Sequence, residues 1–133
     1  MTTGPSSNPY PFVELAGLAA AQGDIDEVIR CWEVVLYRFP GFDRAYTAGA
    51  EAMRKVGREA DADELLRQVV GRSPAYLAGH LEYARSAERR GDWSAAAERW
   101  ALVRVRFPDC DEAREGEAAA LVLAEQQRTT PDH

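Results

Sequence analysis

The sequence predicts an all-α protein built from a repeated pair of helices, and three observations predict it. Three glycines are spaced 34 residues apart, and they are Gly23, Gly57 and Gly91. Three prolines keep the same 34-residue spacing, and they are Pro40, Pro74 and Pro108. Between these positions, apolar residues recur at intervals of three and four residues, which is the period of an α-helix and not of a β-strand. Two independent markers that share one period indicate a structural repeat.

Each marker has a physical role in the predicted pair of helices. Glycine readily adopts the left-handed backbone conformation that ends a helix, so each glycine should end the first helix of a pair. Asp24 and Asp92 follow two of the glycines, where a short acidic side chain can cap the next helix. Proline lacks an N–H and clashes with the preceding turn, so it should end the second helix. The pattern predicts helices at residues 10–21, 25–38, 43–56, 59–72, 76–90, 93–106 and 110–127.

These markers predict one continuous domain at residues 9–128, without an internal linker. The expected repeats cover residues 9–42, 43–76 and 77–110, and a closing helix covers residues 110–127. The closing helix begins like the first helix of a fourth pair but has no turn glycine and no second helix after it. The polar segments at residues 1–8 and 129–133 are expected to be disordered.

The composition excludes several classes of function. The 133 residues are 46% hydrophobic, with a formal net charge of −6 and a pI of about 4.9. Nucleic acids and anionic membrane surfaces attract positively charged proteins, so neither is expected as a partner. No apolar run approaches the roughly 20 residues of a membrane-spanning helix. The first residues also lack the positive start and apolar stretch of a signal peptide, so we expect a cytoplasmic protein.

The side chains that could carry chemistry are few. Cys31 and Cys110 are the only cysteines, too few for a disulfide framework or a metal site, and we interpret them as small buried thiols. His80 stands where the repeat buries an aromatic residue, so it should fill a core position. Trp32 and Trp100 recur at the core position of the second helix. No metal-ligand spacing and no nucleophile-elbow motif is present, so neither an enzyme nor a cofactor is expected.

Residues 9–108 resemble the tetratricopeptide repeat family, whose unit has 34 residues. The family places a large residue early in the first helix, where Phe12, Tyr46 and His80 stand here. It places a small residue four positions later, where Ala16, Ala50 and Ala84 stand. The sequence departs from the family pattern at His80, at Gly49 and at Arg104. The resemblance implies a right-handed α-α superhelix of three helix pairs plus a C-terminal capping helix, with the first helices lining a concave groove.

The resemblance also implies which residues line that groove. The positions carried over from the family are Tyr10, Val13, Arg44, Thr47, Glu51, Arg54, Lys55, Leu81, Arg85, Glu88 and Arg89. The arginines and the lysine would favour an acidic or polar protein segment. A solvated charged face without a ligand is the alternative interpretation. The expected function is a protein–protein interaction module, a scaffold or adaptor that binds a peptide or helix.

Two details of the sequence refine this expectation. Family members that bind chaperone tails use lysines and asparagines to clamp a carboxylate, but the one asparagine here is Asn8, outside the groove. A chaperone-tail adaptor is therefore not expected. The segments around Gly91 and Pro108 resemble bacterial repeats that are attached to glycosyl- or sulfotransferase-type proteins. That resemblance implies a bacterial protein and a possible accessory role in a glycan- or sulfo-transferase system.

The closing helix suggests a different role. Residues 118–124 are apolar on every side of the helix, and Leu121, Val122 and Leu123 point in directions about 100° apart. One or two of these side chains can pack on the preceding helix, but the third cannot. We therefore expect either a weak homodimer through residues 110–127 or a partner helix docked there. A self-associating structural protein is the corresponding alternative function.

Overall fold

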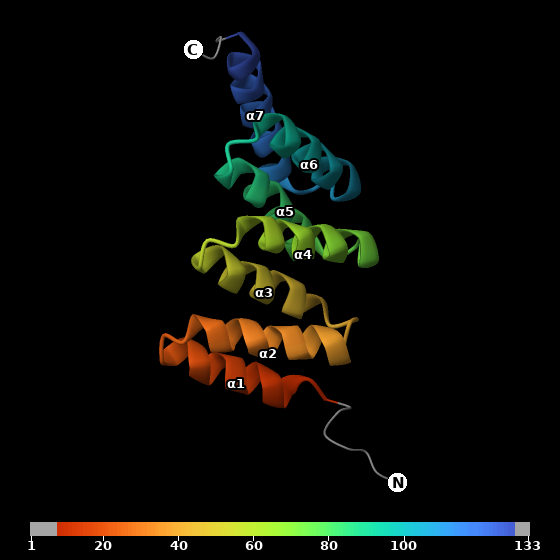
Figure 1. Ribbon diagram of the computed structural model, residues 1–133. Helices are drawn as coiled ribbons and strands as arrows, with labels where there is room; N and C mark the ends of the chain where they lie inside the picture. The colour runs from red at the N-terminus through yellow and green to blue at the C-terminus, as the bar shows by residue number, and fades with distance from the viewer. Residues whose placement is uncertain (1–7, 130–133) are drawn as a thin grey trace. The chain divides into compact units, whose positions relative to one another are not determined.

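In the computed structural model, the described residues 8–129 form seven α-helices and contain no β-strand. The helices are α1 (Tyr10–Ala21), α2 (Ile25–Arg38), α3 (Asp43–Lys55), α4 (Glu59–Arg72), α5 (Leu77–Arg89), α6 (Trp93–Arg106) and α7 (Asp111–Thr129) (Figure 1). The expectation of an all-α protein is confirmed. The chain divides into two compact units, Met1–Gly71 and Arg72–His133. Unit 1 contains α1 to α4 and unit 2 contains α5 to α7.

The ends of the described chain differ slightly from the expectation of disorder. Residues 1–7 and 130–133 lie outside the described residues. Asn8 is described, and its side-chain Oδ1 accepts a hydrogen bond of 2.9 Å from the backbone N–H of Tyr10. At the other end α7 continues to Thr129, whose hydroxyl donates to the backbone oxygen of Glu125 at 3.1 Å. These side-chain bonds hold one residue at each end that we expected to be disordered.

The repeated turns follow the predicted pattern. The backbone φ angles of Gly23, Gly57 and Gly91 are 75°, 82° and 72°, in the left-handed region that favours glycine. The residue after each glycine donates to a carbonyl five residues back, as in a Schellman turn; for Asp24 the acceptor is Ala19, at 2.9 Å. Asp24 also caps α2, since its Oδ1 accepts from the N–H of Glu27 at 3.2 Å.

Unit 2 repeats this N-terminal cap. The Oδ1 of Asp92 accepts from the N–H of Ala95 at 3.2 Å, which satisfies a donor in the first turn of α6. The predicted capping roles of Asp24 and Asp92 are therefore confirmed.

The carbonyl oxygens of the three repeated prolines accept hydrogen bonds from the helix that follows. The Tyr46 hydroxyl donates to Pro40 at 2.7 Å, and the His80 Nε2 lies 2.9 Å from the oxygen of Pro74. The Arg114 guanidinium donates to Pro108 at 3.0 Å. A carbonyl can only accept, so the Nε2 of His80 carries the proton. Each donor stands six residues after its proline, so three different side chains perform one structural task.

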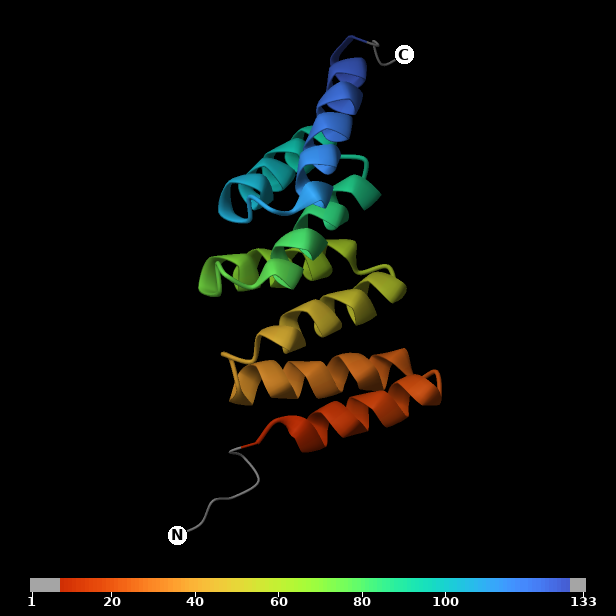
Figure 2. The ribbon, with the colours of Figure 1, turned by 180° about the vertical axis from the view of Figure 1, so that it is seen from behind.

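The core of unit 1 lies between α2 and its neighbours, and Figure 2 shows α1, α2 and α3 lying side by side. Trp32 is 6% exposed, and Val35 is fully buried. A Cβ atom at Gly49 would lie 3.3 Å from Leu65 Cδ1 and 3.5 Å from Trp32 Cβ. The glycine that departs from the family pattern therefore lets α3 pack closely, so it does not loosen the packing.

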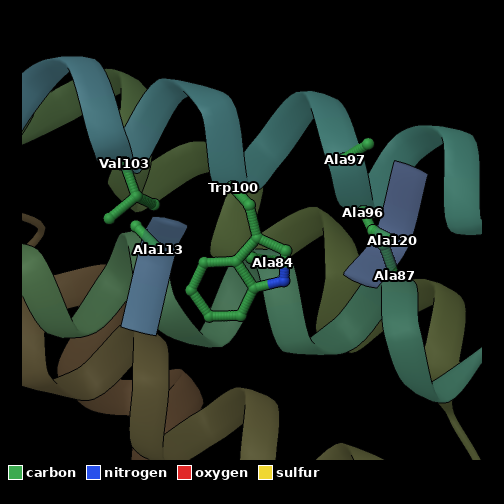
Figure 3. Close-up of a cluster of buried hydrophobic side chains, with 8 residues drawn as sticks. All are labelled: Ala84, Ala87, Ala96, Ala97, Trp100, Val103, Ala113 and Ala120. Carbon is green, nitrogen blue, oxygen red and sulfur yellow. The ribbon is translucent and has the colours of Figure 1, made fainter. Parts of the chain in front are cut away.

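The core of unit 2 surrounds Trp100, which is 1% exposed. Figure 3 shows its ring among side chains from α5, α6 and α7; the cluster comprises Ala84, Ala87, Ala96, Ala97, Trp100, Val103, Ala113 and Ala120. The indole Nε1 donates to Oε2 of Glu88 at 2.7 Å. The helix α7 crosses the ring at Gly116, where a Cβ would lie 2.6 to 2.8 Å from three ring atoms. The predicted core role of Trp100 is confirmed.

Candidate functional site

Unit 1 contains a pocket between α1, α2 and α3 with a volume of about 170 Å³. The residues that line it are Ala20, Ile25, Val28, Trp32, Ala48, Glu51, Ala52 and Lys55. Most of these side chains are apolar, and Trp32 is the largest. The volume is close to that of an engineered cavity of about 150 Å³ that holds one benzene ring. The pocket can therefore accept one apolar side chain, and two of the groove residues carried over from the family, Glu51 and Lys55, line it.

The exposed face of α3 beside this pocket carries positive charge. The Lys55 Nζ lies 3.7 Å from Oε2 of Glu51, and the two side chains are 54% and 59% exposed. Ion pairs at such exposure contribute little to stability and exchange readily with other partners. Arg44 is exposed and Arg54 is half-buried, and neither forms an ion pair with a described residue. An apolar recess with free guanidinium groups on one of its helices suits a ligand that has both apolar and acidic groups.

The other expected groove residues of unit 1 do not line the pocket. Tyr10 is 56% exposed, and its ring meets the ring of Phe42 edge-on at a centroid distance of 5.9 Å. Val13 is half-buried. The Thr47 hydroxyl donates to the backbone oxygen of Arg44 at 3.1 Å. Tyr10 is therefore accessible for contacts, whereas the Thr47 hydroxyl has a partner within α3.

The expected groove arginines of unit 2 have carboxylate partners within the unit. Arg85 pairs with Glu82 at 2.8 Å on its own helix and with Glu112 of α7 at 2.6 Å. Arg89 lies 3.5 Å from Glu82. The hydrogen bond to Glu112 and the pair with Glu82 raise the pKa of Arg85, against an opposing effect of burial. These cations are thus largely neutralised, and the free positive charge that we expected on five residues is concentrated on α3.

Leu81 and Glu88 of α5 also have structural roles. Leu81 is half-buried and packs against the core of unit 2. The carboxylate of Glu88 accepts the Trp100 indole hydrogen bond at 2.7 Å. A buried tryptophan N–H needs such an acceptor, so Glu88 supports the core. The sequence spacing of Glu88 and Trp100 does not reveal this contact, because it joins two helices.

The closing helix α7 exposes part of its apolar run. Leu121 and Val122 are 54% and 57% exposed, whereas Leu123 is half-buried. The prediction that some of these three side chains lack cover within the chain is confirmed. Arg104, a departure from the family pattern, pairs with Glu117 of α7 at 2.5 Å, so the substitution adds an ion pair between α6 and α7.

The side chains that could carry chemistry are His80, Cys31 and Cys110. His80 is 2% exposed, and burial lowers its pKa, while the hydrogen bond to Pro74 opposes that shift. Cys31 is buried, and desolvation raises the pKa of its thiol; Cys110 is half-buried. Among the described residues, no group of three His, Cys, Asp or Glu side chains could hold a metal ion. A helix long and apolar enough to cross a membrane is likewise absent from residues 8–129.

Comparisons with known proteins identify the fold. No family model matches the chain, and no curated protein matches it. The TPR2B domain of yeast Sti1, in a complex with pHsp70, aligns with a TM-score of 0.72 at 17% identity and covers 90% of this chain and 98% of that domain. The first TPR of Spaghetti (RPAP3), bound to the HSP90 peptide SRMEEVD, aligns with a TM-score of 0.72 at 17% identity over 93% of this chain and 98% of that one.

A third solved structure is an enzyme that contains such repeats. A Thermobaculum terrenum O-GlcNAc transferase aligns with a TM-score of 0.69 at 22% identity, and the match covers 91% of this chain but 23% of the transferase. At these identities the likeness concerns the fold, and the resemblance seen in the sequence agrees with it. The chain has the fold of tetratricopeptide repeat domains.

Proposed function

We propose that this protein is an interaction module that binds a segment of another protein on the exposed face of α3 and in the adjoining pocket of unit 1. The observation that carries this proposal is the apolar recess at Trp32 and Ala48, lined also by Lys55, with Arg44 and Arg54 on the same helix. We expect an apolar side chain of the partner to enter the recess and its carboxylates to pair with the arginines. Two of the structural neighbours are described as peptide or chaperone complexes, which supports a protein ligand.

The arrangement that we propose for the whole chain is three helix pairs, at residues 9–42, 43–76 and 77–110, followed by the capping helix 110–127. The three left-handed glycines and the three prolyl carbonyl contacts recur with this period, which supports it. Arg85 and Arg89 are the positively charged positions of unit 2 that the family pattern assigns to binding. Because Arg85 already pairs with Glu112, we expect its contribution to binding to be smaller than that of Arg54.

A charge-reversal experiment tests the binding surface. The double variant Arg44→Glu, Arg54→Glu should lose the partner, because two favourable charges become repulsive. Its matched control is Arg30→Glu, Arg67→Glu, which changes the same charge on exposed positions of α2 and α4. Partners captured by the wild-type protein from its native lysate should be absent with the first variant and retained with the control. Equal capture by both variants would move the site away from α3.

Self-association through α7 is the second candidate function, and one observation favours it. Ala118 and Leu121 stand 34 residues after Ala84 and Ala87, which are fully buried. The same positions of α7 are exposed, and Leu121 is 54% exposed. The face that packs on another helix in α5 is thus uncovered in α7. A weak dimer should appear in sedimentation over a concentration series and disappear with Leu121→Glu, whereas a strict monomer at high concentration would exclude this role.

An accessory role in a glycan- or sulfo-transferase system is the third candidate. Its support is the likeness to the repeat segment of the O-GlcNAc transferase, which makes up a minor part of that enzyme. The partner would then be a transferase subunit, and it should be among the proteins captured in the experiment above.

A further inference from the structure

Unit 2 contains a second pocket, with a volume of about 390 Å³, where the loop after α6 meets the start of α5. The residues that line it are Leu77, Arg106, Phe107, Pro108, Asp109 and Cys110. None of them belongs to the predicted groove. The volume lies within the range of roughly 300–1,000 Å³ that is typical of small-ligand sites.

The repeat explains why space is present here. Cys110 stands two 34-residue periods after Phe42, and Ala78 stands two periods after Tyr10. In unit 1 the rings of Tyr10 and Phe42 meet edge-on, with their centroids 5.9 Å apart. In unit 2 the corresponding positions hold a thiol and a methyl group. Two aromatic rings are therefore missing from this place in unit 2, and the pocket lies beside it.

Unit 1 has a second pair of neighbouring rings, and unit 2 keeps a ring at both corresponding positions. Phe12 and Phe39 of unit 1 lie 6.5 Å apart, and the corresponding rings of His80 and Phe107 lie 5.4 Å apart in an edge-on arrangement. Phe107 lines the pocket while it packs against His80. The Phe107 ring thus forms an aromatic wall of the pocket. Aromatic rings attract one another in edge-on or offset-stacked contacts, so this wall favours the binding of another ring.

The charged groups at the pocket favour a neutral ring. Arg106 corresponds to Arg38, whose guanidinium lies 5.5 Å from the centroid of the Phe12 ring. An arginine at this position can therefore lie against an aromatic face. Asp109 also lines the pocket, so that a cation and an anion are both present. Burial lowers the pKa of His80, which keeps the imidazole behind Phe107 neutral near pH 7.

We propose that this pocket binds one uncharged aromatic group, such as phenol or indole, beside Phe107 and Cys110. This group lies beside the positions at which unit 1 has the rings of Tyr10 and Phe42. Either a free aromatic molecule or an aromatic side chain of another protein can supply it. The site is independent of the binding surface on α3 and does not rest on its function.

Cys110 provides a direct readout, because this residue lines the pocket. The native protein is treated with iodoacetamide, and the alkylation of each cysteine is followed by mass spectrometry. Cys31 is buried and desolvation raises its pKa, so it should react slowly and serve as an internal reference. Indole should slow the alkylation of Cys110 several-fold and leave Cys31 unchanged. Equal protection by cyclohexanol, which has a similar size and no aromatic ring, would overturn the proposal.

Two variants place an aromatic ring at one of the two positions where unit 2 lacks one, and each should fill the pocket. Ala78→Tyr keeps the thiol, and indole should no longer change its alkylation rate; Ala78→Ser is the control and should retain the effect. Cys110→Phe should abolish the heat of indole binding in calorimetry, which gives a second measurement if the first variant does not fold. Undiminished indole binding in either folded variant would contradict the assignment of the site.

The source of the ring is distinguished with a short peptide. Protection of Cys110 by N-acetyl-Gly-Trp-Gly-amide but not by the matching leucine peptide assigns a side chain of another protein. Protection by free indole alone assigns a small aromatic molecule. If neither indole nor the tryptophan peptide protects Cys110, the pocket does not bind aromatic rings and the proposal is wrong.

Discussion

The contact between α7 and Trp100 leads to a sharp prediction for Gly116→Ala. The added Cβ would lie 2.6, 2.7 and 2.8 Å from Cε2, Cδ2 and Nε1 of the indole, far inside normal contact distance. The ring cannot easily move away, because it is 1% exposed and its N–H is bonded to Glu88 at 2.7 Å. Such overpacking costs about 1–3 kcal/mol. The better helix propensity of alanine returns about 0.5–1 kcal/mol. The net effect should therefore lie between no change and a loss of about 2.5 kcal/mol.

Gly17→Ala is the matched control. Gly17 lies in α1, and a Cβ there would meet no atom within 4 Å. The same substitution should therefore stabilise the protein by about 0.5–1 kcal/mol through helix propensity and the unfolded state. Urea denaturation followed by circular dichroism measures both free energies of unfolding. If Gly116→Ala is as stabilising as Gly17→Ala, the close approach of α7 to Trp100 is wrong.

Two further predictions concern the core of unit 2. Trp100→Ala should lower the free energy of unfolding by about 3–5 kcal/mol, the range for large buried aromatics; in urea denaturation, a loss below about 1 kcal/mol would place Trp100 outside a packed core. Burial keeps His80 neutral in the folded state, so the unfolded state takes up the proton first as the pH falls below the ordinary histidine pKa of about 6.5. Stability should therefore decrease as the pH falls below about 6.5, and His80→Tyr, which copies the Tyr46 contact with Pro40, should remove most of that decrease. An unchanged pH dependence in the variant would assign it to other groups.

Much of the fold was predictable because the residues that end its helices act locally. A glycine with positive φ and a proline without an N–H act on their own turns, so their spacing located every described helix to within two residues. The end of α7 was less predictable. Glu125 stands where the other pairs have a turn glycine, and the helix continues through it to Thr129. The missing turn glycine was visible in the sequence, but α7 extends two residues beyond the expected end at residue 127.

The contacts between helices were not predictable from spacing alone. Arg85 meets Glu112, which is 27 residues away, and Glu88 meets Trp100 on the next helix. Both pairs depend on how side chains of neighbouring helices are oriented. Family positions therefore indicated a row of groove residues but not which of them already have partners. The second pocket does leave a signal in the sequence. When corresponding positions of the 34-residue repeat are compared, Cys110 and Ala78 stand where unit 1 has two aromatic rings.

The central claim, that a protein segment binds at the recess beside α3, is tested most directly by site-specific photocrosslinking. A photoreactive phenylalanine analogue is introduced in place of Ala48, which lines the recess, or in place of Ala60, an exposed residue of α4 that does not line it. The two proteins carry the same group and differ only in its position. We predict that the partner is crosslinked from Ala48 and not from Ala60. Crosslinking from Ala60 alone, or equally from both positions, would contradict the account.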